Sequence, residues 1–156
     1  MNIENRIKEL GIELPVAASP QAMYVPTKQA GNLVFVSGQI PVKEGVMQYT
    51  GKVGEERSLE EAKEAARLCA INIVSALKAH LGDLDKVKSI IKITCFVASK
   101  TGFDKQHLVA NGASELLFDI FGEAGRHTRS AVSVNQLPLD ATVEVEAIVE
   151  AELKVS

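Results

Sequence analysis

Two residues in the last third of the chain have the chemistry of a small-acid site, Arg129 and Glu144. Arg129 stands near the start of an apolar, alternating run that predicts a strand over residues 128–134. A guanidinium is planar and permanently charged, and its donors match the two oxygens of a carboxylate. Arg129 therefore either anchors a small acid or forms a salt bridge with one of the glutamates of the final strand.

Glu144 lies at the start of the last predicted strand, over residues 142–155. A carboxylate beside a bound substrate can position and polarise a water molecule. A solvated glutamate at the edge of a strand has the same sequence signature, and the spacing does not separate the two. If the last two strands pair through the loop at residues 137–141, they run antiparallel, and Glu144 need not be far from the functional edge of the sheet.

Histidines and cysteines give no metal-binding pattern. His80, His107 and His127 have no spacing typical of a metal cage. We expect His80 and His107 to lie at helix ends or on the surface. His127 lies two residues before Arg129, so a contact with a ligand and a purely structural role are both compatible with its position. The two cysteines lie in apolar runs and are expected to be reduced core thiols. No phosphate-binding glycine motif and no nucleophile elbow occurs, so we expect neither a metal nor an organic cofactor.

Composition restricts the class of protein. The 156 residues carry a formal net charge of −3, with 46% hydrophobic and 24% charged residues. We expect a single soluble domain over residues 1–156, in which residues 1–20 form a helical extension and a loop. The pI near 5.7 and the scarcity of aromatic residues argue against a nucleic-acid partner. No apolar run approaches the roughly 20 residues of a membrane helix, and we expect a cytoplasmic protein without a membrane partner.

The elements that must position Arg129 and Glu144 follow the order ββ-α-β-α-ββ after a short leading helix. Gly31 and Asn32 predict a turn, and Ser58 with Glu61 forms a capping box that opens a helix. The segment at residues 43–56 is expected to be loop. This order predicts an α+β fold with two helices packed on one face of a mixed sheet. The expected elements are a leading helix at 2–10, a hairpin at 24–37, a helix at 58–82, a central strand at 86–99, a helix at 103–121 and strands at 128–134 and 142–155.

Three segments together resemble the RidA/YjgF family of reactive intermediate deaminases. They are LVFVSGQIPV, FVAS and RSAVSVNQLPLDATVEVEAI, and the resemblance runs from about residue 24 to residue 149. It implies the chorismate-mutase-like (YjgF-like) fold, assembled as a homotrimeric barrel with a ligand cleft between each pair of subunits. It also implies hydrolysis of reactive enamine or 2-imino acids to 2-oxo acids and ammonia, without a metal or a cofactor.

The same resemblance implies roles for individual residues. Arg129 falls on the arginine that clamps the substrate carboxylate, and Glu144 on the glutamate that orients the attacking water. The chain departs from the short members of the family where they carry a tyrosine, a proline and a cysteine, and resembles a longer subgroup. Those three positions are Ser114, His127 and Ala131. The residues implied to contact the substrate besides Arg129 are Tyr24, Ser37, Asn111, His127 and Ser130.

Three functions are compatible with these residues. The first is an enamine or imine deaminase, and the second is a non-catalytic sensor that binds small carboxylates such as 2-oxo acids. The third is an endoribonuclease, a label sometimes attached to the family. The acidic pI, the few aromatic residues and the lack of a histidine pair for acid–base chemistry make the ribonuclease the weakest of the three.

Overall fold

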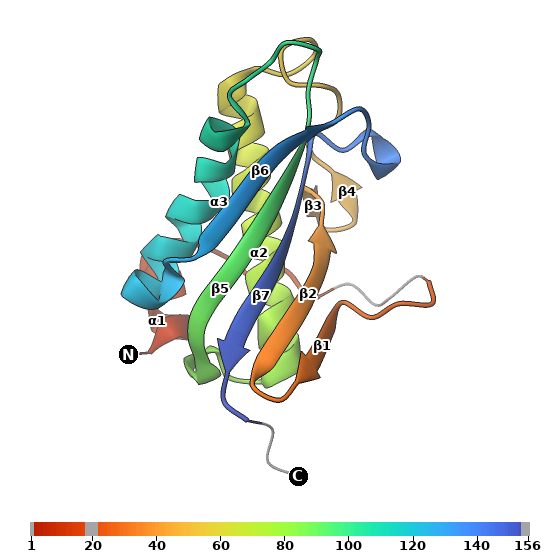
Figure 1. Ribbon diagram of the computed structural model, residues 1–156. Coiled ribbons are helices and arrows are strands. Elements are labelled where there is room, and N and C mark those ends of the chain that lie inside the picture. Colours follow the sequence, from red (N-terminus) through yellow and green to blue (C-terminus); the bar gives the residue numbers. More distant parts are fainter. Residues whose placement is uncertain (1, 18–21, 154–156) are drawn as a thin grey trace.

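The computed structural model describes residues 2–17 and 22–153, and its main feature is a five-stranded mixed sheet (Figure 1). The strand order is β1-β2-β7-β5-β6; β5 and β6 run parallel, and the other neighbouring pairs run antiparallel. This arrangement confirms the predicted α+β class. The strands are β1 (Thr27–Ala30), β2 (Leu33–Gln39), β5 (Val87–Ala98), β6 (Thr128–Val134) and β7 (Val143–Ala151).

Two long helices, α2 (Leu59–Leu81) and α3 (Gln106–Phe121), cover the same face of this sheet (Figure 1). The predicted capping box is present, because Ser58 accepts from the Glu61 amide while the Glu61 carboxylate accepts from the Ser58 amide. The start predicted for the next helix, at residue 103, is wrong by three residues. Residue Lys105 makes no side-chain cap there, so no local signal marks the true start. The leading helix is α1 (Ile3–Glu9).

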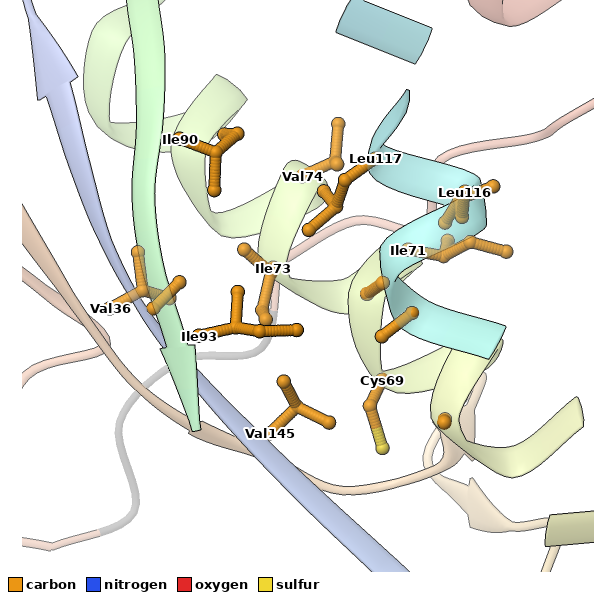
Figure 2. Packing of buried hydrophobic residues seen from close by; sticks show 14 of the residues in the cluster. Val36, Cys69, Ile71, Ile73, Val74, Ile90, Ile93, Leu116, Leu117 and Val145 are labelled. Atoms are coloured by element: carbon orange, nitrogen blue, oxygen red, sulfur yellow. The ribbon is translucent and has the colours of Figure 1, made fainter. Parts of the chain in front are cut away.

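The core fills the space between the sheet and the two helices (Figure 2). Ile93 of β5, Ile73 of α2 and Leu117 of α3 are fully buried in it. Burial of a side chain of this size contributes about 1.5–3 kcal/mol, so this layer supplies much of the stability. The alternation predicted for the last strand is confirmed over residues 143–151, with the apolar side chains buried and the glutamates on the opposite face.

The other face of the sheet carries no helix in the part of the chain that the structure describes. Phe35 of β2 and Val132 of β6 point to this face and are 46% and 43% exposed. Glu144 and Glu146 of β7 stand on the same face. We refer to it below as the open face, and to the side that α2 and α3 pack against as the covered face.

Three expectations need correction. The segment expected to be loop contains a small hairpin of β3 (Val42–Lys43) and β4 (Val46–Met47). The last strand ends at Ala151 rather than at residue 155, and residues 154–155 lie outside the described residues, as do residues 18–20 of the predicted extension. The last two strands do not pair, because β5 lies between them.

The separation of β6 from β7 has a topological cause. The crossover through α3 returns the chain parallel to β5, so β6 adds to the free edge of β5 and β7 pairs with the other edge. The connection between β6 and β7 contains the short 3-10 helix η3 (Pro138–Asp140), in which Leu139 and Asp140 both have φ of +58°. The connection from β6 to β7 therefore passes the end of β5 and is not a tight hairpin turn.

Candidate functional site

Arg129 lies on the edge strand β6, with its side chain on the covered face against α3. Its Nη1 donates hydrogen bonds to Asn111 Oδ1 at 2.8 Å and to Ser114 Oγ at 3.1 Å. Its Nη2 donates to the backbone carbonyl of His107 at 3.2 Å. All three acceptors belong to one helix, which fixes the guanidinium at the edge of the sheet.

The guanidinium keeps donors for a ligand. It has five N–H groups, of which three are engaged by α3. Within residues 2–17 and 22–153, no carboxylate forms an ion pair with Arg129 and no acceptor bonds to its Nε. The salt bridge to a glutamate of the last strand, the alternative raised by the sequence, is therefore absent from this part of the chain. One donor on Nε and one on Nη2 remain, which match the two oxygens of a carboxylate.

His127 is joined to Arg129 through Ser114. Its Nε2 lies 2.9 Å from Ser114 Oγ, and its Nδ1 lies 2.8 Å from the carbonyl oxygen of Gly125. Partial burial lowers the pKa of His127, and the positive charge of Arg129 lowers it further. The hydrogen bond to the Gly125 carbonyl acts in the opposite direction and raises this pKa. We call the four residues Asn111, Ser114, His127 and Arg129 the arginine cluster.

Glu144 is half-buried on the open face, where its carboxyl group packs over the backbone of Gly38. A Cβ atom at Gly38 would stand 2.2 Å from Glu144 Oε1, so any larger residue at position 38 would require the Glu144 side chain to shift. The pairing register of β2 with β7 shifts between Val36 and Gln39, which marks an irregularity at the same place. Burial raises the pKa of Glu144, and repulsion from Glu146 raises it further.

Tyr24 and Ser37 belong to the same region as Glu144. Ser37 Oγ donates to the carbonyl of Val25 at 2.7 Å and so ties the segment that carries Tyr24 to the end of β2. The Tyr24 side chain is 61% exposed and available for contact. We call Tyr24, Ser37, Gly38 and Glu144 the glutamate cluster.

The two clusters do not meet within one chain. Arg129 pairs with Ile93, which pairs with Ala147, and Glu144 lies three residues from Ala147. An odd separation along a strand puts the two side chains on opposite faces of the sheet. In addition, β2 and β6 are three strand spacings apart, or about 14 Å. Ser130, which the resemblance also implies in binding, pairs with Thr94 and is exposed on the open face of β6.

The sequence reasoning missed two members of the Arg129 environment, the Ser114 hydroxyl and the His107 carbonyl. A signal for them does exist. Residues 107, 111 and 114 follow one another at helical spacings of four and three, so they form a single stripe along α3. A polar stripe of this kind on a helix that precedes a strand with an arginine is the pattern to search for.

Other kinds of site find no support in the described ranges. No group of three potential metal ligands occurs among these residues, and none of their helices is long and apolar enough to cross a membrane. A shallow surface hollow of about 560 Å³ lies between α1 and the end of α3, lined in part by Arg6, Glu9 and Phe118. It includes no member of the arginine cluster or the glutamate cluster.

Comparison with known proteins gives a family match over most of the chain. Residues 4–151 match the family described as "YjgF/chorismate_mutase-like, putative endoribonuclease". The chain is 47% identical to Protein TCP17 of Trypanosoma cruzi, over 92% of this chain and 91% of the relative. It is 34% identical to 2-iminobutanoate/2-iminopropanoate deaminase of Salmonella typhimurium, over 86% of this chain and 89% of the relative.

Solved structures give the same result. The protein Atu1372 of Agrobacterium tumefaciens, described as having unknown function, is 50% identical with a TM-score of 0.91, over 96% of this chain and 92% of that chain. The structure of E. coli TdcF with bound serine is 30% identical in sequence, with a TM-score of 0.60. The match covers 88% of this chain and 93% of that chain. The chain therefore belongs to the YjgF/RidA family, whose members include reactive intermediate deaminases.

Proposed function

We propose that this protein hydrolyses reactive 2-imino acids to 2-oxo acids and ammonia, and that Arg129 binds the carboxylate of the substrate. The observation that carries the proposal is the state of the guanidinium. Three hydrogen bonds hold it against α3, no ion pair within the described residues neutralises it, and two of its donors remain. The 34% identical relative that is named as an imine deaminase supports the reaction type.

The catalytic site requires a second copy of the chain, because the arginine cluster and the glutamate cluster lie on opposite faces of one sheet. We propose a homotrimer in which the arginine cluster of one subunit faces the glutamate cluster of the next. The open edge of β6 and the exposed Phe35 and Val132 of the open face support such an assembly. Light scattering of the purified protein should give three times the 16.8 kDa chain mass. A value equal to one chain mass would contradict the shared site.

The proposed reaction makes small demands on the protein. The iminium carbon is already electrophilic, and Arg129 fixes the acid so that this carbon faces Glu144 of the neighbouring subunit. Glu144 accepts one proton as water adds to the carbon, and it returns the proton to the nitrogen of the tetrahedral intermediate. The C–N bond then breaks and ammonia leaves. The C–OH group becomes the carbonyl of the 2-oxo acid as its proton passes to the ammonia, which departs as ammonium. The raised pKa of Glu144 suits it to both transfers.

A direct test follows the release of 2-oxo acid from an imine that an amino-acid oxidase generates in the assay. Wild-type protein should accelerate release above the rate in buffer, and Arg129→Ala should remove the acceleration. Arg129→Lys is the matched control, because it keeps the charge but loses the planar pair of donors, and it should retain part of the activity. Equal rates for wild type and Arg129→Ala would reject the proposal.

A second function, non-catalytic binding of small carboxylates, is favoured by one observation. The arginine cluster is complete within a single chain, whereas the proposed base must come from another. A sensor of this kind would bind pyruvate saturably without turnover and would be stabilised toward heat by it. No shift in melting temperature at millimolar pyruvate would reject this alternative.

A further inference from the structure

Ser114 is placed between two nitrogen atoms, one from Arg129 and one from His127. Its Oγ lies 3.1 Å from Arg129 Nη1 and 2.9 Å from His127 Nε2. Arginine is only ever a donor, so the hydroxyl must accept the bond from Nη1. The single hydrogen of Ser114 is therefore available for His127.

The carbonyl of Gly125 determines which nitrogen of His127 carries the proton. A carbonyl oxygen accepts only, so His127 Nδ1, at 2.8 Å from it, must be the donor. In a neutral imidazole, Nε2 is then the acceptor, and it takes the hydrogen of Ser114. The result is a directional relay in which Arg129 donates to Ser114, Ser114 donates to His127, and His127 donates to Gly125.

The end of this relay is rigid. Gly125 is buried in the short 3-10 helix η2 (Gly122–Gly125), and a Cβ atom there would stand 2.3 Å from the carbonyl oxygen of Leu117 on α3. This close contact between η2 and α3 fixes the Gly125 carbonyl relative to the helix that also carries Ser114. Burial favours the neutral imidazole that the relay requires, since it lowers the pKa of His127.

We propose that Ser114 and His127 are positioning residues for Arg129: together they orient the guanidinium so that its remaining donors point at the carboxylate of the ligand. The proposal rests on the function proposed above for Arg129 as the carboxylate anchor, and it adds two residues that act only through that anchor. The Ser114 hydroxyl and both ring nitrogens of His127 bond to protein atoms. The proposal therefore gives both residues a positioning role, and for His127 it replaces the substrate contact that the family resemblance implies.

The first experiment needs no ligand. In protein labelled with ¹⁵N-arginine, the guanidinium signals of Arg129 are assigned by their absence in Arg129→Lys, and the rate of rotation of its Nη groups is measured. Ser114→Ala and His127→Phe should each increase this rate by about threefold to tenfold, the effect of losing one hydrogen bond. Ser114→Thr keeps the hydroxyl and should match wild type. His107→Ala is the matched control for the loss of an imidazole, because it keeps the backbone carbonyl that Arg129 uses.

The second experiment measures the affinity of the assembled protein for pyruvate by calorimetry. Ser114→Ala should weaken binding by about threefold to tenfold, and Ser114→Thr should restore it. His127 reaches Arg129 only through the Ser114 hydroxyl. The double variant Ser114→Ala with His127→Phe should therefore weaken binding no more than the stronger single variant, and not by the product of the two single fold-changes. The melting temperature of each variant separates these effects from a general loss of structure.

The outcomes distinguish the relay from the proposed function. Unchanged rotation of Arg129 in both Ser114→Ala and His127→Phe would overturn the relay, whether or not pyruvate binds. Pyruvate binding that depends on Arg129 but not on Ser114 or His127 would also overturn the relay and leave the proposed function intact. Faster rotation in these variants, with no binding of pyruvate by wild type, would support the relay as a positioning device and count against the acid-binding function.

Discussion

The covered face and the open face of the sheet hold their polar residues in different ways. On the covered face, Arg129 makes three hydrogen bonds to α3. His127, which is joined to Arg129 through Ser114, bonds to the carbonyl of the buried Gly125. On the open face, Glu144 is held by packing against Gly38, and burial makes its charged form less favourable. The proposed acid anchor is therefore held in place before a ligand arrives, whereas the proposed base, Glu144, carries a charge that burial makes costly.

The sharpest way to test this division is to remove the base without removing the anchor. Glu144→Gln keeps the size of the side chain but cannot accept a proton. Turnover of the imine should fall by about a hundredfold or more, while the affinity for pyruvate should stay within about twofold of wild type. Steady-state rates and calorimetry on the same preparation give both values. If affinity and turnover fell together, the two faces would not have separate roles.

A second comparison concerns stability and assembly. Leu117→Ala in the covered layer should lower the free energy of unfolding by about 2–5 kcal/mol, because a fully buried side chain leaves a cavity. Val132→Asp on the open face should instead lower the assembled mass in light scattering, because it puts a charge on the surface proposed to meet another subunit. A loss of assembly in the first variant, with none in the second, would reverse the assignment of the two faces.

The smallest effect expected is on the pH dependence of stability. The folded protein holds the proton of Glu144 more tightly than the unfolded chain does, so its contribution to stability is lost as the pH rises above 4.5 and through the raised pKa. Glu144→Gln should therefore raise the melting temperature at pH 7 by no more than about 2 °C. This gain should vanish well below pH 4.5, where the carboxyl group is protonated in both the folded and the unfolded state. A gain that is the same at both pH values would show that the charge of Glu144 is not its source.

Local signals predicted much of the fold. The capping box at Ser58, the stop at Gly82 and the bounds 128–134 of β6 were all readable, because each depends on residues close together in the chain. The start of α3 was not readable, since no side chain caps it. The position of β5 between β6 and β7 was not readable either, because the order of strands depends on a crossover through α3 and not on the connecting loop.

For the candidate site as well, the sequence indicated the residue types but not their placement in space. The residue types of Arg129 and Glu144 pointed to acid binding and water activation, but their placement on opposite faces follows only from the strand register. Ser114 and His127 are 13 residues apart and on different elements, so nothing local joins them. In the sequence they are merely two departures from the pattern of the short family members, whereas in the structure they contact each other.

The packing of Glu144 over Gly38 has a consequence for how this protein could change over time. A single methyl group at position 38 would overlap Glu144 Oε1 and force the carboxyl group out of its place, while the hydrogen bonds of Arg129 on the other face would stay intact. One codon change could therefore remove the proposed hydrolysis and leave the proposed binding of the same acids, because Arg129 and its hydrogen-bond partners would be unaltered.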